Sequence, residues 1–217
     1  MSASFHPADE MLAAYGAGSL DEGTAVLIST HLALCPRCRK EVARVEAMGG
    51  AMLEELSAAE MGEGALDSVL SRIASLSSPP PPPPSVPSPG PSFFPRPLRD
   101  YVGADLATLP WKRLAKGIEQ VILLESHATR VRLLRIGAGV VVPEHGHGGM
   151  ELTMALQGGF ADQGHHYGRG DVAVADGATV HSPAADRSEP CICLAVTDAP
   201  LKLTGMMGRL LNPFLDL

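Results

Sequence analysis

Apolar residues before residue 77 recur at the spacing of one helical face. Glycines at Gly16 and Gly18 end the first of these runs. Asp21 suits the N-cap of a second helix and Pro36 the first turn of a third, because these residue types favour helix N-termini. The pattern therefore predicts a small all-α unit with helices near residues 7–16, 21–34, 36–56 and 66–76.

In the second half of the chain, apolar residues tend to recur at every second position, which is the spacing of a β-strand. Short apolar and β-branched runs are separated there by turns that contain glycine or proline. These runs lie at residues 131–136, 140–142, 152–156, 171–174 and 191–196. Many short strands with frequent turns favour an antiparallel barrel or sandwich.

Six consecutive prolines, at residues 79–84, stand between the two patterns. Proline removes the backbone donor and fixes φ, so this stretch predicts an extended spacer, with a proline-rich docking site as the alternative. We expect a two-domain α+β protein with a helical domain at 1–76, a proline-rich linker at 77–97 and a β-barrel domain at 98–217.

Charge narrows the range of partners. The 217 residues carry a formal charge of −7, and residues 1–78 hold 11 acidic against 5 basic side chains. Such a module repels phosphate, which argues against direct binding of nucleic acid. No apolar run approaches the roughly 20 residues of a membrane helix, and the N-terminus lacks the features of a signal peptide. We expect a soluble cytoplasmic protein without a membrane partner, and the sequence leaves its oligomeric state open.

The helical part contains a metal-binding pattern. His31, Cys35 and Cys38 follow one another at about one helical turn, so their side chains can face one point. Tetrahedral zinc needs a fourth ligand, and His6 is the only other His or Cys before the prolines. Zinc would also stabilise a module with a thin core. The alternatives are two reduced cysteines without metal, or a redox pair, although no βαβ pattern surrounds Cys35 and Cys38.

A second metal-binding pattern lies in the β part. His145 and His147 are two residues apart, so they point the same way on a strand, and Glu151 follows on the next segment. With glycines at both ends, from Gly139 to Gly158, the spacing is similar to the first motif of the cupin family.

The cupin resemblance implies a fourth ligand from a second motif, and His181 has the right spacing after Gly170. That second motif is otherwise degraded, with Asp176, Ala178 and Ala185 where cupins carry proline, glycine and asparagine. Three imidazoles and a carboxylate suit zinc, iron, manganese or nickel, and ligand type alone does not choose among them.

Cys191 and Cys193 lie two apart on an apolar run, which places both thiols on one face of a strand. Their expected Cα separation is awkward for a disulfide. They are either small apolar core residues or thiols that face the metal pocket as oxidation-sensitive groups or spare ligands.

The helical pattern, with a histidine upstream of H-x3-C-x2-C, resembles the zinc-binding anti-sigma factors. A helical zinc module, a linker and a cupin-like domain together resemble the ChrR type, over nearly the whole chain. The resemblance implies that the first module wraps an extracytoplasmic-function sigma factor and that zinc occupies both sites. Two features agree independently: the acidic charge, and an apolar surplus larger than four short helices need, at Leu27, Ile28, Met48, Met52 and Met61.

We therefore expect an anti-sigma factor rather than an enzyme, and assign no catalytic residue. The resemblance implies release of the sigma factor on oxidative stress, such as singlet oxygen or organic peroxide, sensed through the β domain. The alternative is a metal-dependent cupin enzyme, a dioxygenase or isomerase with a helical regulatory domain.

Overall fold

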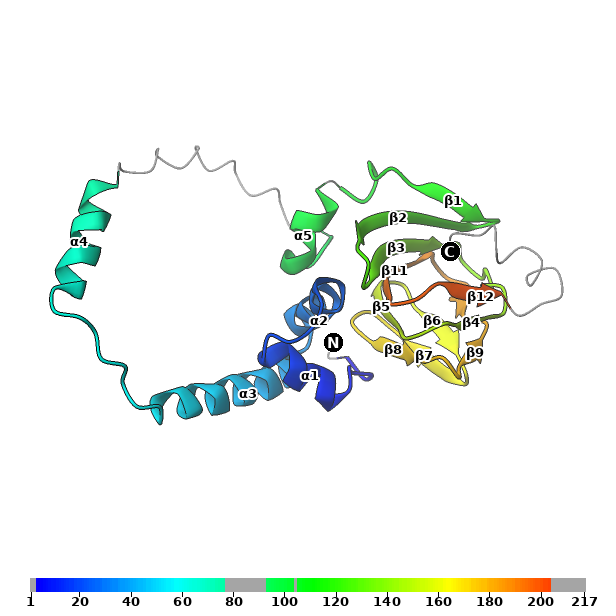
Figure 1. The fold of residues 1–217 in the computed structure, drawn as a ribbon. Helices are drawn as coiled ribbons and strands as arrows, with labels where there is room; N and C mark the ends of the chain where they lie inside the picture. Colours follow the sequence, from blue (N-terminus) through cyan, green and yellow to red (C-terminus); the bar gives the residue numbers. More distant parts are fainter. Residues whose placement is uncertain (1–2, 77–92, 104, 204–217) are drawn as a thin grey trace.

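A computed structural model describes residues 3–76, 93–103 and 105–203. The chain has the expected α+β organisation, with helices first and antiparallel strands after them (Figure 1). Most of the predicted linker at 77–97 lies outside the described residues. The boundaries of the two domains therefore stay a prediction.

All four helices predicted before the prolines are present, and a fifth follows the prolines. Their bounds are α1 Asp9–Gly16, α2 Glu22–Leu34, α3 Pro36–Glu54, α4 Ala65–Ser75 and α5 Arg96–Val102. Asp21 caps α2 as expected, since its Oδ1 accepts a hydrogen bond from the backbone N–H of Thr24 at 3.0 Å. Among the described residues, no helix combines the length and apolar character needed to cross a bilayer.

The expected four-helix domain is not confirmed, because α4 stands apart from the other described helices. No residue of α4 is buried, and the helix lies away from the rest of the described chain (Figure 1). Instead, α5 packs against α2, and the hydroxyl of Tyr101 donates a hydrogen bond to Glu22 Oε1 at 2.9 Å. The seven-residue α5 is too short for its periodicity to have predicted it.

Twelve strands make up the described β part. They are β1 Lys112–Ala115, β2 Ile118–Glu125, β3 Arg130–Ile136, β4 His145–His147, β5 Glu151–Gln157, β6 Phe160–Asp162, β7 His165–Tyr167, β8 Val172–Ala175, β9 Val180–His181, β10 Ala184–Ala185, β11 Cys191–Thr197 and β12 Leu201–Leu203. A six-stranded antiparallel sheet has the order β1-β2-β3-β11-β5-β8. Two three-stranded sheets have the orders β10-β6-β7 and β12-β4-β9.

Two expectations about the strands need correction. The described strands form three separate sheets rather than one closed barrel. The apolar run at 140–142 forms no strand, since Val141 makes only an isolated bridge to Ala184. By contrast, β2 was not expected, because its apolar residues are partly contiguous and do not alternate with polar ones.

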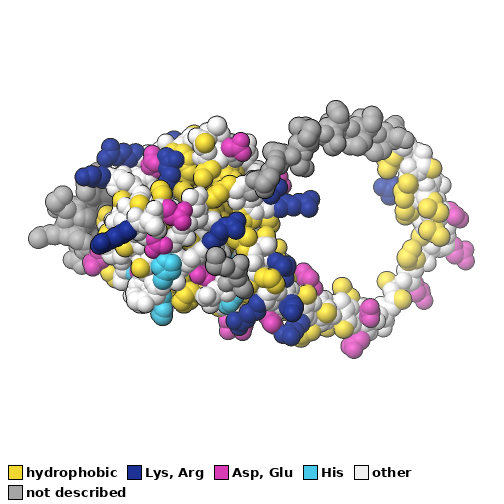
Figure 2. Space-filling view, turned by 180° about the vertical axis from the view of Figure 1, so that it is seen from behind, with side chains coloured by type: hydrophobic (Ala, Val, Ile, Leu, Met, Phe, Trp, Pro, Cys, Tyr) yellow, Lys and Arg dark blue, Asp and Glu magenta, His cyan; other side chains and the backbone are white. Residues whose placement is uncertain are grey.

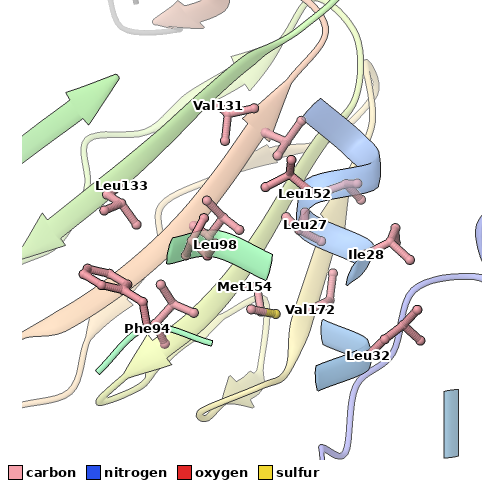
Figure 3. Packing of buried hydrophobic residues seen from close by; sticks show 14 of the residues in the cluster. Leu27, Ile28, Leu32, Phe94, Leu98, Val131, Leu133, Leu152, Met154 and Val172 are labelled. Atoms are coloured by element: carbon pink, nitrogen blue, oxygen red, sulfur yellow. The ribbon is translucent and has the colours of Figure 1, made fainter. Parts of the chain in front are cut away.

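Successive side chains of a strand point to opposite faces of the sheet. Both faces of the six-stranded sheet are apolar. One face carries Val131, Leu133, Leu152 and Met154, which pack against α2 and α5 (Figure 3). The other face lines the interior of the β part and belongs to a second cluster, which includes Cys193. Because β5 and β11 are buried on both faces, their sequences are nearly continuous apolar runs.

The helices and the large sheet share one hydrophobic core. Leu27 and Ile28 of α2 are fully buried, and they belong to the same apolar cluster as residues of the sheet (Figure 3). The segment before α1 also joins the β part, since the backbone N–H of Val172 donates to the carbonyl of Phe5 at 3.2 Å. The helical part and the β part are therefore joined by packing and by hydrogen bonding.

Candidate metal centres

The structure brings together all four side chains predicted for the first site. One ligand atom from each of His6, His31, Cys35 and Cys38 lies within 4.8 Å of the others. His31 comes from α2 and Cys38 from α3, while the segment before α1 carries His6. Cys35 is the extended residue between the two helices, where Pro36 begins α3. The short turn between α2 and α3 therefore positions three of the four ligands.

The donor atoms of this group already face one another. The Nε2 atom of His31 lies 3.2 Å from Cys38 Sγ, and His6 Nδ1 lies 3.4 Å from the same sulfur. Burial raises the pKa of the Cys38 thiol to about 12, with a further contribution from the neighbouring Cys35 thiol. Burial also lowers the pKa of His31 and of His6. Two neutral imidazoles and two cysteines, which bind zinc as thiolates after losing their protons, are the donor set of a structural zinc ion.

The first group is held in place by the β part. Because a carbonyl can only accept, the Nδ1–H of His31 donates to the carbonyl of Gly170 at 2.8 Å. This hydrogen bond leaves the lone pair of His31 on Nε2, the atom that faces Cys38. Asp171 holds the segment that carries His6, since its Oδ1 accepts from the backbone N–H groups of Ser4 at 2.5 Å and Phe5 at 2.9 Å.

The second predicted group also converges. Ligand atoms of His145, His147, Glu151 and His181 lie within 4.8 Å of one another. His145 and His147 lie on β4, which pairs with β9 so that His145 stands opposite His181. Glu151 begins β5 and turns its carboxylate towards His147, with 3.8 Å between Oε2 and Nδ1.

Hydrogen bonds fix which imidazole nitrogens of this group carry protons. The Nδ1–H of His145 donates to the carbonyl of Pro143 at 2.8 Å, and His181 Nδ1 lies 2.6 Å from Asp162 Oδ2. Both rings then present a lone pair on Nε2, and these two atoms are only 3.1 Å apart. Two lone pairs at that distance repel unless a cation lies between them, so the group fits a metal ion.

Sequence reasoning missed the residues that support these ligands. Asp162 on β6 orients His181, and Gly170 and Asp171 orient the first group. None lies in a recognisable ligand spacing, and only the folded sheets bring them near the metal ligands. Burial lowers the pKa of His145 and of His147, which favours the neutral, ligating form of each ring.

A cavity of about 270 Å³ opens beside the second group. His145, Glu151 and His181 line it, together with mostly apolar side chains from the interior faces of the sheets. The thiol of Cys193 also lines this cavity, and its sulfur lies 3.3 Å from that of Cys191. The hydrogen bond with Cys191, together with burial, raises the pKa of Cys193 well above its ordinary value.

Comparisons with known proteins agree with both parts of the chain. Residues 6–39 match the family described as a putative zinc finger, and residues 100–200 match the family described as the ChrR cupin-like domain. The anti-sigma-E factor ChrR of Cereibacter sphaeroides is 39% identical over 217 residues, which cover 99% of each chain.

A solved structure is similar over most of the molecule. The crystal structure of Rhodobacter sphaeroides SigE in complex with the anti-sigma ChrR matches with a TM-score of 0.76 and 39% identity. The match covers 89% of this chain and 98% of that one. From the whole-length identity and the two matching domains, we conclude that this chain belongs to the ChrR family of anti-sigma factors.

Proposed function

We propose that this protein is a zinc-dependent anti-sigma factor that sequesters an extracytoplasmic-function sigma factor and releases it under oxidative stress. The observation that carries the proposal is the whole-length similarity to ChrR, which was crystallised with SigE. Because sigma factors act on RNA polymerase, the proposed site of action is the cytoplasm.

An exposed apolar surface supports the proposed sigma contact. We call residues 48–76, which comprise the end of α3, α4 and the segment between them, the arm. Its exposed apolar side chains are Met48, Met52, Leu53, Leu56, Met61, Leu66, Val69, Leu70, Ile73 and Leu76. Hydrophobic side chains gather along this part of the molecule in Figure 2. A surface of this kind on an otherwise well-packed chain is typical of a binding site for another protein.

The charge of the arm favours a basic partner. Five acidic residues and one basic residue lie among its 29 positions. On α4 the apolar residues Leu66, Leu70 and Ile73 recur at helical spacing, so they form one stripe with polar residues on the other side. An amphipathic helix with nothing to cover it among the described residues is suited to lie against the surface of a partner.

The first group, His6, His31, Cys35 and Cys38, would hold zinc as a closed structural site. Two thiolates balance the charge of Zn²⁺, and the ion would join the segment before α1 to α2 and α3. In our proposal this clamp sets the direction in which α3 leaves the core, and therefore the position of the arm.

The second group, His145, His147, Glu151 and His181, would hold zinc or another divalent metal with a coordination position open to the cavity. A short route connects it to the first group. Glu151 stands opposite Ala175 where β5 pairs with β8, and β8 begins at Val172, which binds Phe5. A change at the second metal could therefore shift the segment that carries His6 and loosen the sigma-binding module.

The test is binding of the full chain to the extracytoplasmic-function sigma factor of the same cell, measured by co-purification and by calorimetry. Replacing both cysteines, in Cys35→Ser/Cys38→Ser, should remove zinc from the first group and abolish sigma binding. His127 is an exposed histidine outside both groups, so His127→Gln is the control and should bind normally. Full affinity in the double variant would contradict the proposal.

A further inference from the structure

Among the residues that the structure describes, Arg132 is a buried cation without a matching partner. It lies on β3, its side chain is almost fully buried at 2% exposure, and it lines the cavity beside the second metal group. No acceptor among the described residues lies within hydrogen-bond distance of its buried Nε atom. Burial of the guanidinium lowers its pKa, although the nearby Glu151 carboxylate opposes this shift. An unpaired buried charge is costly, so its presence beside a cavity points to a ligand.

The wall of the cavity around Arg132 is apolar. The apolar lining includes Leu114, Ile118, Leu134, Ile136, Val142 and Phe160. At about 270 Å³ the cavity lies near the lower end of the range for small-molecule sites, roughly 300–1,000 Å³. A fitting ligand is therefore small, with an apolar part that covers this wall.

Charge balance identifies the polar part of that ligand. This step rests on the divalent metal of the proposed function. A divalent metal and Arg132 together carry three positive charges. Glu151 and Asp162, the two carboxylates that line the cavity, carry two negative charges, so one positive charge is left over. One further negative charge would neutralise the site.

We infer that the cavity binds a monocarboxylate with an apolar chain, such as a medium-chain fatty acid. Its carboxylate would pair with the guanidinium of Arg132 in the cavity that the second metal group also lines, and its chain would pack against the apolar wall. A neutral ligand would leave Arg132 unpaired, and a dianion such as phosphate would carry excess charge and no apolar part. Such a ligand would connect β3, which carries Arg132, to β5, which carries Glu151.

The experiment compares octanoate, octanol and acetate as ligands of the full, metal-loaded chain, using calorimetry and thermal shift. Octanoate should bind at least about tenfold more tightly than octanol, because only the carboxylate of octanoate can form an ion pair with Arg132. It should also bind at least about tenfold more tightly than acetate, which lacks the chain.

Variants assign the effect to one residue. Arg132→Met should weaken octanoate binding about tenfold or more, whereas Arg132→Lys, which keeps the charge, should retain part of the affinity. Arg135→Met is the matched control on the same strand, because Arg135 pairs with Glu119 and stacks on Trp111 outside the cavity. It should bind octanoate normally.

Equal affinity for octanoate and octanol would overturn the inference, and so would undiminished octanoate binding by Arg132→Met. If Arg132→Met does not fold, the comparison of octanoate with octanol in the unaltered chain still tests the inference. Metal analysis distinguishes a failure of the ligand from a failure of the metal site. Metal at the second group without octanoate binding rejects this inference alone, whereas a second group that takes up no metal rejects both it and the proposed second metal site.

Discussion

The Nδ1–H of His31 donates a hydrogen bond to the carbonyl of Gly170 at 2.8 Å, so the β part orients a histidine of the helical candidate metal group. The next residue, Asp171, holds the segment that carries His6 through the N–H groups of Ser4 and Phe5. Two of the four ligands in the first group are thus positioned from outside the helices. Outer partners of this kind fix the ring orientation and tune the affinity for metal.

Removing the Asp171 carboxylate should therefore loosen zinc in the helical group. In Asp171→Ala, the N–H groups of Ser4, Phe5 and Gly168 lose their acceptor, and the segment that carries His6 is held less firmly. We expect zinc affinity to fall by roughly tenfold or more, as is usual for lost outer partners of a metal ligand. The measurement is the rate of zinc transfer to a chromogenic chelator.

Asp105→Ala is the matched control for this prediction, because Asp105 is an exposed residue remote from both metal groups. Its zinc should transfer at the rate of the unaltered protein. If Asp171→Ala also transfers zinc at that rate, the β part does not position the ligands.

Because α2 packs closely on the sheet, a larger residue in place of Gly23 should destabilise the protein. A Cβ atom at Gly23 would lie 2.4 Å from the Thr129 hydroxyl and 2.9 Å from a methyl of Val131. We expect Gly23→Ala to lower the free energy of unfolding by about 1–3 kcal/mol through overpacking. Gly50, also inside a helix, has open space within 4 Å of the position that a Cβ atom would take, so Gly50→Ala should instead stabilise by about 0.5–1 kcal/mol.

Urea titration of both glycine variants, monitored by circular dichroism, gives the comparison. Opposite signs for the two substitutions support docking of the helical part on the sheet. A Gly23→Ala protein as stable as Gly50→Ala would mean that α2 does not pack there.

Asp21 should contribute a pH-dependent part of the stability. Burial of this carboxylate opposes ionisation, but hydrogen bonds from Thr24 and Thr129 outweigh it and lower the pKa below its ordinary value of 3.8. Because the pKa is lower in the folded state, the stabilisation is complete above pH 3.8 and disappears as the pH falls through the folded value.

The non-titrating Asp21→Asn keeps the shape and capping ability of the side chain and isolates this effect. Unfolding of both proteins by urea at about pH 7 and about pH 3 should show the unaltered protein more stable at the higher pH and the difference reduced at the lower one. A difference that does not change with pH would contradict the assignment.

Charge on the apolar stripe of the arm should abolish sigma binding and spare the fold. Leu70 and Ile73 are about half exposed, and no residue of α4 is buried. We therefore expect Leu70→Glu/Ile73→Glu to melt at the temperature of the unaltered protein while losing at least about tenfold in sigma affinity. Ser68→Glu, on the opposite side of α4, is the control and should bind normally.

Calorimetric titration with the sigma factor and a thermal melt of each arm variant provide the two readouts. Normal binding by the double variant would exclude α4 from the interface.

The sequence predicted most members of the two metal groups because these residues lie at local spacings that secondary structure converts into convergence. His31, Cys35 and Cys38 follow helical turns, and His145 and His147 follow a strand. His6 followed from elimination, since no other His or Cys precedes the prolines. His181 lies far from the other three members of its group in the sequence, and only the resemblance to the second cupin motif implied it.

Other features depended on contacts between distant residues. Asp162 approaches His181 only because separate sheets meet at the cavity, and Asp171 reaches Ser4 across 167 positions of sequence. The sequence also did not predict the core shared by the helices and the sheet, because Leu27 and Ile28 were equally compatible with partner binding and with burial in a core. They are core, whereas Met48, Met52 and Met61, the other members of that apolar set, are exposed and lie on the arm.

The central claim is that a metal bound by His6, His31, Cys35 and Cys38 organises the helices that hold the sigma factor. The most direct measurement is the affinity of the full chain for that sigma factor before and after metal is removed with a chelator, and again after zinc is restored. We predict that affinity is lost on removal and returns with zinc. Undiminished binding by the metal-free chain would contradict the account.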